Sequence, residues 1–152
     1  MRNRGSVVII EENKVCLIKR VRESSTYYVF PGGGIEKEEK PEEAAIREAF
    51  EELGVTVGIR ECLAELEYQG TQYFFLANVV SGTIGSGKGE EFTDRNQDRG
   101  TYLPMGVKIE NLTAIDVKPR VIANKVEDLF ARKRIFCNND LYFRRSLLLS
   151  VS

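Results

Sequence analysis

The sequence predicts an α+β fold, in which a mixed, largely antiparallel sheet lies between helices. Three observations predict it. Short β-branched runs fill the first thirty residues, an amphipathic helical pattern covers 41–53, and helical periodicity returns after further strand-like runs near residue 119. Strands and helices in this order are typical of a layered domain with one hydrophobic core, which a chain of 152 residues can bury without disulfides.

The first predicted elements are strands. The segments 6–11 and 14–21 are rich in β-branched residues and are divided by a turn at Asn13, which predicts a hairpin. A third strand is predicted at 26–30. It ends at the sequence Pro31-Gly32-Gly33-Gly34, where glycine allows the backbone to approach a ligand closely.

The segment 41–53 is predicted to be a helix with marked ends. Pro41 suits the first helical position, acidic residues follow it in the first turn, and Gly54 suits the position just after the last turn. At about 100° per residue, the apolar residues fill one arc and the charged residues the opposite arc. The charged arc contains Arg47, Glu48, Glu51 and Glu52.

The second half of the chain is predicted to hold three strands and a helix. Strands are expected at 55–69, 71–80 and 102–109, and a helix at 119–133. The long connection 81–100 is rich in glycine and is therefore expected to be either functional or disordered. We expect one domain over residues 1–134, followed by a C-terminal tail over 135–152.

Composition narrows the classes of function. The net charge of −1 offers no basic excess for a nucleic-acid backbone, so a large nucleic acid is not an expected partner. The absence of histidine excludes histidine-based nucleophilic and acid–base catalysis. Cys16, Cys62 and Cys137 lack a paired spacing and are interpreted as reduced, mostly structural thiols. The short apolar run near the N-terminus fits neither a signal peptide nor a membrane span, so a cytoplasmic protein is expected.

The acidic arc of the predicted helix suggests a cation site. Glu48, Glu51 and Glu52 stand at i, i+3 and i+4, where like charges destabilise a helix by roughly 0.2–0.5 kcal/mol per pair. Arg47 can pair with Glu51, but one arginine does not neutralise three acids, whereas a divalent cation with oxygen ligands would. The alternative for this segment alone is a solvated helix face.

The spacing of these residues resembles the Nudix box. The conserved positions of that motif, G-x5-E-x7-R-E-U-x-E-E-x-G-U with U aliphatic, fall on Gly33, Glu39, Arg47, Glu48, Ala49, Glu51, Glu52, Gly54 and Val55. The resemblance implies a Nudix-type α/β/α sandwich and a Mg²⁺- or Mn²⁺-dependent hydrolase that cleaves a pyrophosphate bond.

The resemblance also implies roles for individual residues. Glu48, Glu51 and Glu52 would be metal ligands together with the carbonyl of Gly32, while Gly33, Glu39 and Gly54 would support the site structurally. Arg47 would hold Glu51 in position. The general base would be Glu48 or Glu52, unless the connection 81–100 supplies it through Glu90 or Glu91; the alternative for the latter pair is exposed loop charges.

Three departures from the common family pattern are visible. Glu38 stands where the family often has glycine, and Lys40 takes the helix-capping position often held by threonine. Gly106 stands where many relatives carry tryptophan. The first two departures predict an altered substrate fit with the metal ligands intact, and Gly106 removes one possible stacking contact.

Residues outside the motif are interpreted less specifically. Arg20 and Arg22 are expected either to meet substrate phosphates or to be solvated strand-edge charges. Tyr28 is expected to contribute to substrate binding within an aromatic group that includes Tyr27, Tyr73, Phe74 and Phe75. Alternating strand residues face opposite ways, so roughly half of this group must be core.

The resemblance predicts a nucleotide-like small-molecule substrate. A nucleoside triphosphate pyrophosphohydrolase, including one for oxidised nucleotides, is the leading expectation, and ADP-ribose, nucleotide sugars and capped RNA ends remain alternatives. A rival interpretation is a nucleotide-binding Nudix scaffold without turnover. The expected assembly is a monomer or homodimer without membrane association.

Overall fold

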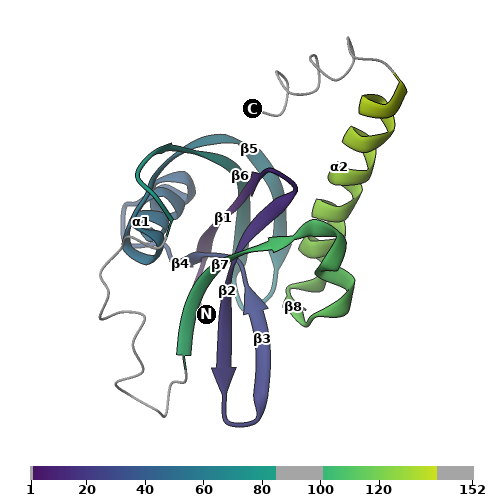
Figure 1. Cartoon of the computed structure of the whole chain (residues 1–152). Helices are drawn as coiled ribbons and strands as arrows, with labels where there is room; N and C mark the ends of the chain where they lie inside the picture. The colour runs from purple at the N-terminus through teal and green to yellow at the C-terminus, as the bar shows by residue number, and fades with distance from the viewer. Residues whose placement is uncertain (1, 85–100, 140–152) are drawn as a thin grey trace.

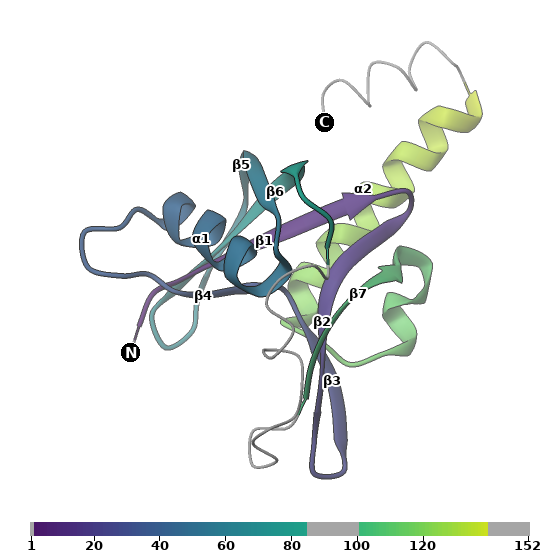
Figure 2. The ribbon, with the colours of Figure 1, turned by 60° about the vertical axis from the view of Figure 1, so that its left-hand side comes forward.

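A computed structural model gives the structure of residues 2–84 and 101–139, with side chains described up to residue 132. Figure 1 shows a curved sheet with helix α1 (Pro41–Leu53) on one side and helix α2 (Arg120–Asn139) on the other. The view in Figure 2 agrees, with both helices outside the strands. The predicted α/β/α sandwich is confirmed.

The sheet has eight strands within the described residues and is built around β1. The strand bounds are β1 Arg4–Glu11, β2 Lys14–Arg22, β3 Ser25–Val29, β4 Gly32–Gly34, β5 Thr56–Glu67, β6 Thr71–Ser81, β7 Thr101–Lys108 and β8 Val117–Lys118. Strand β1 pairs in parallel with β6, and β3 pairs in parallel with β8, while the other pairs are antiparallel. The sheet is therefore mixed and largely antiparallel, as predicted.

The hairpin β1–β2 joins two groups of strands. In one group β1 lies between β6 and β4, and β6 also pairs with β5. In the other group β2 lies between β7 and β3, and β3 also pairs with β8. The Glu12–Asn13 turn joins β1 to β2, and both turn residues have positive φ, at 50° and 68°.

Strand β4 was not expected from the sequence, which predicted a glycine-rich loop at this position. Gly32, Gly33 and Gly34 instead pair antiparallel with Ser6, Gly5 and Arg4 of β1. Glycine is depleted from strands because it lacks a side chain to pack, so propensity gave no signal here. The pairing fixes the glycine segment against the sheet instead of leaving it free.

Helix α1 has the predicted bounds and the predicted ends. It begins at Pro41, and Gly54 follows it in the left-handed conformation at φ 76°, with its N–H donating to the Phe50 carbonyl at 3.0 Å. The Lys40 backbone N–H donates to the Glu43 carboxylate at 2.8 Å. Lys40 was expected to cap poorly, and its side chain makes no cap hydrogen bond. Glu43 supplies only the return half of a capping box, by accepting the Lys40 N–H.

The last elements of the described chain differ from the prediction: two short elements were not expected, and the final helix is longer. A 3-10 helix, η2 (Ile109–Ala114), follows β7, and the short strand β8 precedes α2. Helix α2 continues to Asn139, six residues beyond the expected end at 133. The division of the chain at residue 134 stays a prediction, although the helical backbone runs across that position.

Two hydrophobic clusters form the core, one on each side of the sheet. One cluster lies between the sheet and α1 and includes Val7, Ile9, Cys16 and Leu53. The other lies toward α2 and includes Val8, Val15, Leu17 and Ile122. Neighbouring residues of β1 and β2 thus face opposite clusters, as the period of a strand requires. Among the described residues, no helix is long and apolar enough to cross a membrane.

Candidate active site

Arg47 is the centre of a carboxylate cluster, which we define as Glu39, Glu48, Glu51 and Glu52 around this arginine. Its guanidinium donates from Nε and Nη2 to the Glu39 carboxylate at 2.8 and 3.0 Å, and from Nη1 to Glu48 at 3.0 Å. Nη2 also donates to the carbonyl of Gly34 at 2.9 Å. One side chain thus ties helix α1 to strand β4 and to the loop between them.

Glu39 braces the loop before α1. Its carboxylate also accepts the backbone N–H of Glu36 at 2.8 Å, and its side chain is only 15% exposed. The hydrogen bonds from Arg47 and from the Glu36 backbone lower the pKa of Glu39 to about 2. The same contact with Glu39 raises the pKa of Arg47 above its ordinary value. Glu39 therefore stays ionised and fixed at neutral pH.

Glu48 and Glu52 converge on the backbone of β4. They are four residues apart and so lie on one face of α1. The Gly32 N–H donates to Glu52 at 2.9 Å, and a Cβ on Gly33 would overlap the carboxylate of Glu48. Position 33 must therefore be glycine for Glu48 to take this place. The motif's first glycine has a steric reason in this structure.

Glu51 is placed differently from the other two acids. Its contact with Arg47, at 3.4 Å, is longer than those that Arg47 makes with Glu39 and Glu48, and its side chain is 52% exposed. Arg47 was predicted to hold Glu51, but its shorter contacts go to Glu39 and Glu48. Within residues 2–84 and 101–132, no group of three or more acidic or cysteine side chains is gathered closely enough to hold a metal ion.

Glu38 shows why the family often has glycine at this position. Its φ is 67°, in the left-handed region that costs an L-residue roughly 1–2 kcal/mol. A glycine at this position would adopt the same backbone conformation without this steric cost. The departure affects the loop, while the box residues keep their contacts.

The predicted substrate residues Arg20, Arg22 and Tyr28 lie on different faces. Alternate residues of β2 point to the same side of the sheet, so Arg20 and Arg22 share a face with Cys16. Cys16 packs in the cluster under α1, whereas Val15 and Leu17 pack in the opposite cluster. Tyr28 packs against the cluster on the α2 side. Its neighbour Tyr27 is opposite Arg20 in the β2–β3 register, with the Arg20 guanidinium 5.8 Å from its ring.

The other predicted aromatic residues are mostly core. Phe74 and Phe75 are buried on opposite sides of the sheet, and Phe74 makes an edge contact with Phe30 at 6.0 Å. Tyr73 stacks on Phe75 and is partly buried. Tyr73 and Phe75 therefore fit the core alternative, whereas Phe74 is a core residue that also lines a cavity.

A cavity of about 420 Å³ lies next to β4. Arg4, which lines it, donates to the carbonyl of Gly32 at 3.4 Å, and the N–H of Gly32 is bound to Glu52. Val29, Phe30, Tyr68, Phe74 and Lys118 are among its other lining residues. The cavity is therefore connected to β4 through Arg4, and β4 in turn contacts the carboxylate of Glu52.

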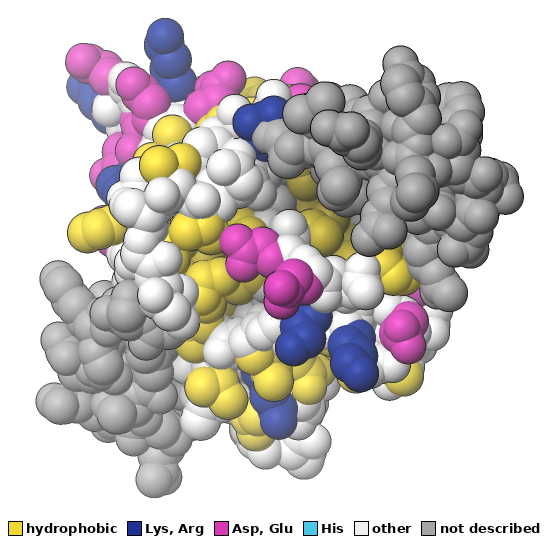
Figure 3. All heavy atoms as spheres, turned by 45° about the horizontal axis from the view of Figure 1, so that its top comes forward, with side chains coloured by type: hydrophobic (Ala, Val, Ile, Leu, Met, Phe, Trp, Pro, Cys, Tyr) yellow, Lys and Arg dark blue, Asp and Glu magenta, His cyan; other side chains and the backbone are white. Residues whose placement is uncertain are grey.

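A second cavity, of about 320 Å³, lies between β1, β2 and β7. Ile9, Cys16, Ile84 and Met105 contribute its apolar lining, and Glu11 and Lys14 are charged lining residues. Figure 3 shows a face on which hydrophobic side chains form a hollow beside acidic and basic ones.

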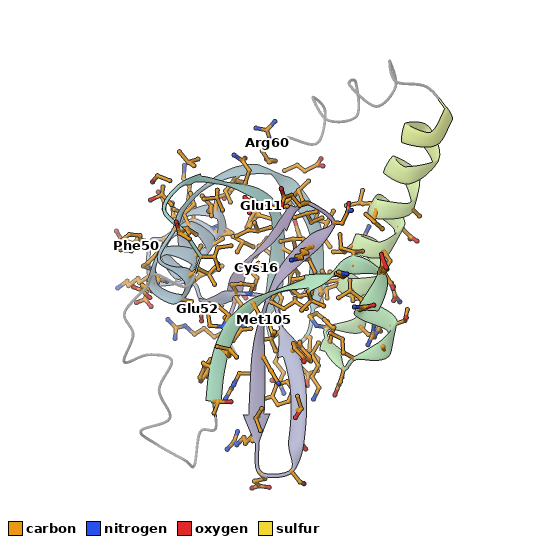
Figure 4. All side chains as sticks on the ribbon, viewed as in Figure 1. Glu11, Cys16, Phe50, Glu52, Arg60 and Met105 are labelled. Carbon is orange, nitrogen blue, oxygen red and sulfur yellow. The ribbon has the colours of Figure 1, made fainter. Side chains whose placement is uncertain are left out.

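Cys16 lies deep in the molecule between two acidic residues. Burial, and secondarily the charges of Glu11 and Glu52, raise the pKa of the thiol to about 12. Figure 4 shows Cys16 between these two labelled residues, with Phe50 on the outer side of α1. A thiol with this pKa is a poor nucleophile, which agrees with the structural role expected for Cys16. Cys62 is a free, exposed thiol, while the side chain of Cys137 lies outside the described residues.

Sequence reasoning missed Arg4 and Lys118 as candidate site residues. Arg4 stands at the start of β1 and Lys118 in a two-residue strand, and no local pattern marks either. Strand pairing alone places these two residues, because β1 pairs with β4 and β8 pairs with β3. Glu90 and Glu91, the predicted alternatives for the general base, lie outside the described residues.

Comparison with known proteins adds a family assignment. The model of the NUDIX domain matches residues 1–99. Diphosphoinositol polyphosphate phosphohydrolase 2 of Mus musculus and of Homo sapiens is 38% identical over 73 residues, which is 48% of this chain. The aligned part is 40% of the length of those relatives.

Solved structures share the fold over most of the chain. A NUDIX hydrolase from Nitrosomonas europaea superposes with a TM-score of 0.63 at 22% identity, covering 86% of this chain and 88% of that one. A MutT structure from a study of Aliivibrio salmonicida and Vibrio cholerae gives a TM-score of 0.64 at 20% identity, covering 84% and 96%. At these identities the likeness establishes the fold.

Proposed function

Because the chain belongs to the NUDIX family, we propose that it is a MutT-like hydrolase that cleaves a pyrophosphate bond in a nucleoside diphosphate linked to another group. One observation carries the proposal. The carboxylates of Glu48 and Glu52 meet the backbone of Gly32 and Gly33, while Arg47 ties the same helix to the same strand. Catalysis of phosphoryl transfer depends mostly on such positioning and on electrostatics.

The donor set at β4 fits Mg²⁺ or Mn²⁺. Two carboxylates and the Gly32 carbonyl are hard oxygen donors, and Mg²⁺ is commonly held by one or two carboxylates together with substrate phosphates and water. Glu51 would join them by leaving its long contact with Arg47. When bound, the cation neutralises negative charge that develops on the phosphate oxygens.

The remaining chemistry is assigned to side chains of the chain itself. Either Glu48 or Glu52 takes the proton of the attacking water; the N–H of Gly32 orients Glu52, and Arg47 orients Glu48. A positioned carboxylate base contributes typically about 10²- to 10⁴-fold to rate. Arg47 and Glu39 act by positioning, since their contacts hold the helix and the loop together.

The favoured substrate is a nucleoside triphosphate, including an oxidised one, with ADP-ribose or a nucleotide sugar as alternatives. The cavity beside Gly32 is of the size that holds small organic ligands, and its aromatic and basic lining suits a phosphorylated ring. The curated relatives, by their names, act on diphosphoinositol polyphosphates, so this substrate class is a second candidate. We propose a cytoplasmic monomer or homodimer.

The test is a substrate panel with Mg²⁺ and with Mn²⁺, run on the natural protein and on Glu52→Gln and Glu48→Gln. We expect pyrophosphate-bond cleavage that falls at least about 100-fold in Glu52→Gln, with unchanged circular dichroism. Glu42→Gln, an exposed acid on the same helix, is the matched control and should retain the natural rate.

Two results would contradict the proposal. Cleavage that survives Glu52→Gln at the natural rate would remove this residue from catalysis. Metal-dependent nucleotide binding without any product across the panel would favour the non-catalytic scaffold. The rate ratio of Glu48→Gln to Glu52→Gln, followed against pH, distinguishes the general base from a residue that only holds the cation.

A further inference from the structure

Residues 2–4, at the entry to β1, contact β4 and the loop after it at three points, and we define them as the entry clamp. The Arg4 side chain donates to the carbonyl of Gly32 at 3.4 Å. The backbone carbonyl of Asn3 accepts the N–H of Ile35 at 2.9 Å. The clamp therefore contacts the first residue of β4 and the residue that follows its last one.

The Arg2 side chain supplies the third point of contact. Its Nη2 donates to the Glu36 carboxylate at 2.8 Å, and its guanidinium lies so close to Gly34 that a Cβ there would overlap it. The side chains of this ion pair are 62% and 59% exposed, so solvent screens the pair and it adds little stability. The clamp therefore depends more on Asn3 than on Arg2.

Helix α1 holds the same segment through other atoms. Arg47 donates to the carbonyl of Gly34 at 2.9 Å and to the Glu39 carboxylate at 2.8 Å. Glu39 in turn accepts the N–H of Glu36 at 2.8 Å. The segment that contains β4 thus has one anchor on the catalytic helix and another on the entry clamp.

Strand β4 depends on these anchors because it has no side chains. All three of its residues are glycine, so side-chain packing cannot lock it, and glycine has the widest choice of backbone conformations. Its pairing with β1 involves only Arg4, Gly5 and Ser6. Gly32 nevertheless presents its N–H to Glu52 at 2.9 Å. The position of this N–H is therefore set by the short pairing with β1 and by the contacts at the two ends of β4.

Asn3 extends the clamp to a distant part of the chain. Its side-chain Oδ1 accepts the N–H of Thr71, at the start of β6, at 2.9 Å. The preceding Gly70 has a φ of 105°, and a Cβ there would come within 2.8 Å of the Arg2 carbonyl oxygen. Strand β6 also pairs with β1, so this turn is fixed to the body of the sheet. Asn3 thus contacts the β5–β6 turn with its side chain and Ile35 with its backbone.

We propose that Asn3 is a positioning residue of the active site. It ties β4 to the β5–β6 turn, and it thereby sets where Gly32 presents its N–H to Glu52 and its carbonyl to a cation. Asn3 touches no reacting atom and acts only through β4. The inference rests on the proposed function for the roles of Gly32 and Glu52, but its structural part can be measured without turnover.

The experiment compares Asn3→Leu, which removes the acceptor of the Thr71 N–H at similar volume, with Asn3→Asp, which keeps an acceptor oxygen. Hydrogen–deuterium exchange followed by NMR reports on the amides of Thr71, Ile35 and Gly32. In Asn3→Leu we expect faster exchange at all three amides, an affinity for Mn²⁺ alone that is about tenfold weaker, and a kcat that is about tenfold lower with little change in KM. Asn3→Asp should restore all of these quantities.

The matched control is Asn124→Leu, the same substitution at an exposed asparagine of α2. It should leave the three exchange rates, the Mn²⁺ affinity and kcat as they are in the natural protein. Asn3→Ala removes the same acceptor with a smaller side chain and should reproduce the effect of Asn3→Leu. Thermal melting checks that each variant is folded at the temperature of the assays.

The inference is overturned if Asn3→Leu accelerates exchange at Thr71 alone, because the hydrogen bond would then be a local feature of the turn. It is also overturned if Asn3→Leu and Asn124→Leu have the same Mn²⁺ affinity and the same kcat. Loss of Mn²⁺ affinity and of Gly32 protection in Asn3→Leu, in a protein that cleaves no diphosphate, would contradict the proposed hydrolase and support this inference. Cleavage that is insensitive to Asn3→Leu would do the reverse.

Discussion

The carboxylate cluster and a cation–aromatic row use opposite means to hold charge in place. In the cluster, Arg47 donates hydrogen bonds to Glu39 and Glu48 at 2.8–3.0 Å, so its acids are partly neutralised and rigid.

The cation–aromatic row crosses β7, β2, β3 and β8. Tyr102 and Tyr27 are the register partners of Arg20 on either side, and the Arg20 guanidinium lies 3.8 Å and 5.8 Å from their rings. The Lys118 amine lies 4.6 Å from the Tyr27 ring. Charge-assisted hydrogen bonds fix the geometry of the cluster, whereas a ring contact orients a cation by a weaker and less directional attraction.

This difference predicts that the two regions respond differently to substitution. Changes in the cluster should affect folding stability and turnover together, because the same contacts do both. Changes in the row should affect ligand binding with little effect on stability. The following substitutions test that division, beginning with the largest expected effect.

Arg47→Gln should cause the largest loss of folding stability among these substitutions. It removes a guanidinium that is 29% exposed and that contacts two acids and the Gly34 carbonyl at 3.0 Å or less. Hydrogen bonds to charged groups suggest a loss of about 2 to 3 kcal/mol in the free energy of unfolding. Urea denaturation measures it, alongside the rate of cleavage. Arg47→Lys keeps the charge without the planar fork and should recover less than half of the loss; full recovery would show that charge alone suffices.

Glu39→Gln should weaken the same cluster in a pH-dependent way. The folded pKa of Glu39, about 2, lies below its ordinary value of 4.5. Ionised Glu39 therefore stabilises the fold fully above about pH 4.5, and this contribution is lost as the pH falls toward 2. The difference in unfolding free energy between the natural protein and Glu39→Gln should shrink between about pH 6 and pH 3. A difference that stays constant over this range, with Glu42→Gln as control, would contradict the assigned ion pair.

Tyr28→Leu and Tyr27→Leu compare two neighbouring tyrosines on opposite faces of β3. Tyr28 packs against the core cluster toward α2, so its replacement should cost about 1 to 2 kcal/mol in unfolding free energy. Tyr27 contacts cations of the row, so its replacement should cost less stability and weaken nucleotide binding more. Thermal melting and calorimetry measure the two effects. The reverse pattern would place Tyr28, as first predicted from the sequence, on the substrate side.

Glu38→Gly should have the smallest effect and the opposite sign. Glu38 has a φ of 67°, which glycine adopts without steric cost, although glycine loses more freedom on folding. The net stabilisation should be about 0.5–1 kcal/mol, measured by urea denaturation. Lys37→Gly, at the preceding position, is a control that should not stabilise. Equal effects at both positions would show that loop composition matters and backbone conformation does not.

Much of the candidate site followed from local spacing. A helix places residues four apart on one face, so the convergence of Glu48 and Glu52 was implied by their positions in the sequence. The helix ends were also local, since Pro41 and Gly54 restrict or permit backbone conformations. The preference of Arg47 for Glu39 over Glu51 was not local. It depends on how the loop before α1 folds back over the helix.

The sequence by itself determined the order of the six longer strands and the two α-helices, the bounds of α1 and the motif that marks the family. Each depends on periodicity or spacing within a few turns of chain. Only the tertiary structure decided that the glycines form β4, that Tyr27 and not Tyr28 meets Arg20, and that Arg4 and Lys118 line one cavity. These facts depend on which strands pair and in which register. A shift of one residue turns every side chain of a strand to the other face, and no local pattern in this chain fixes that choice.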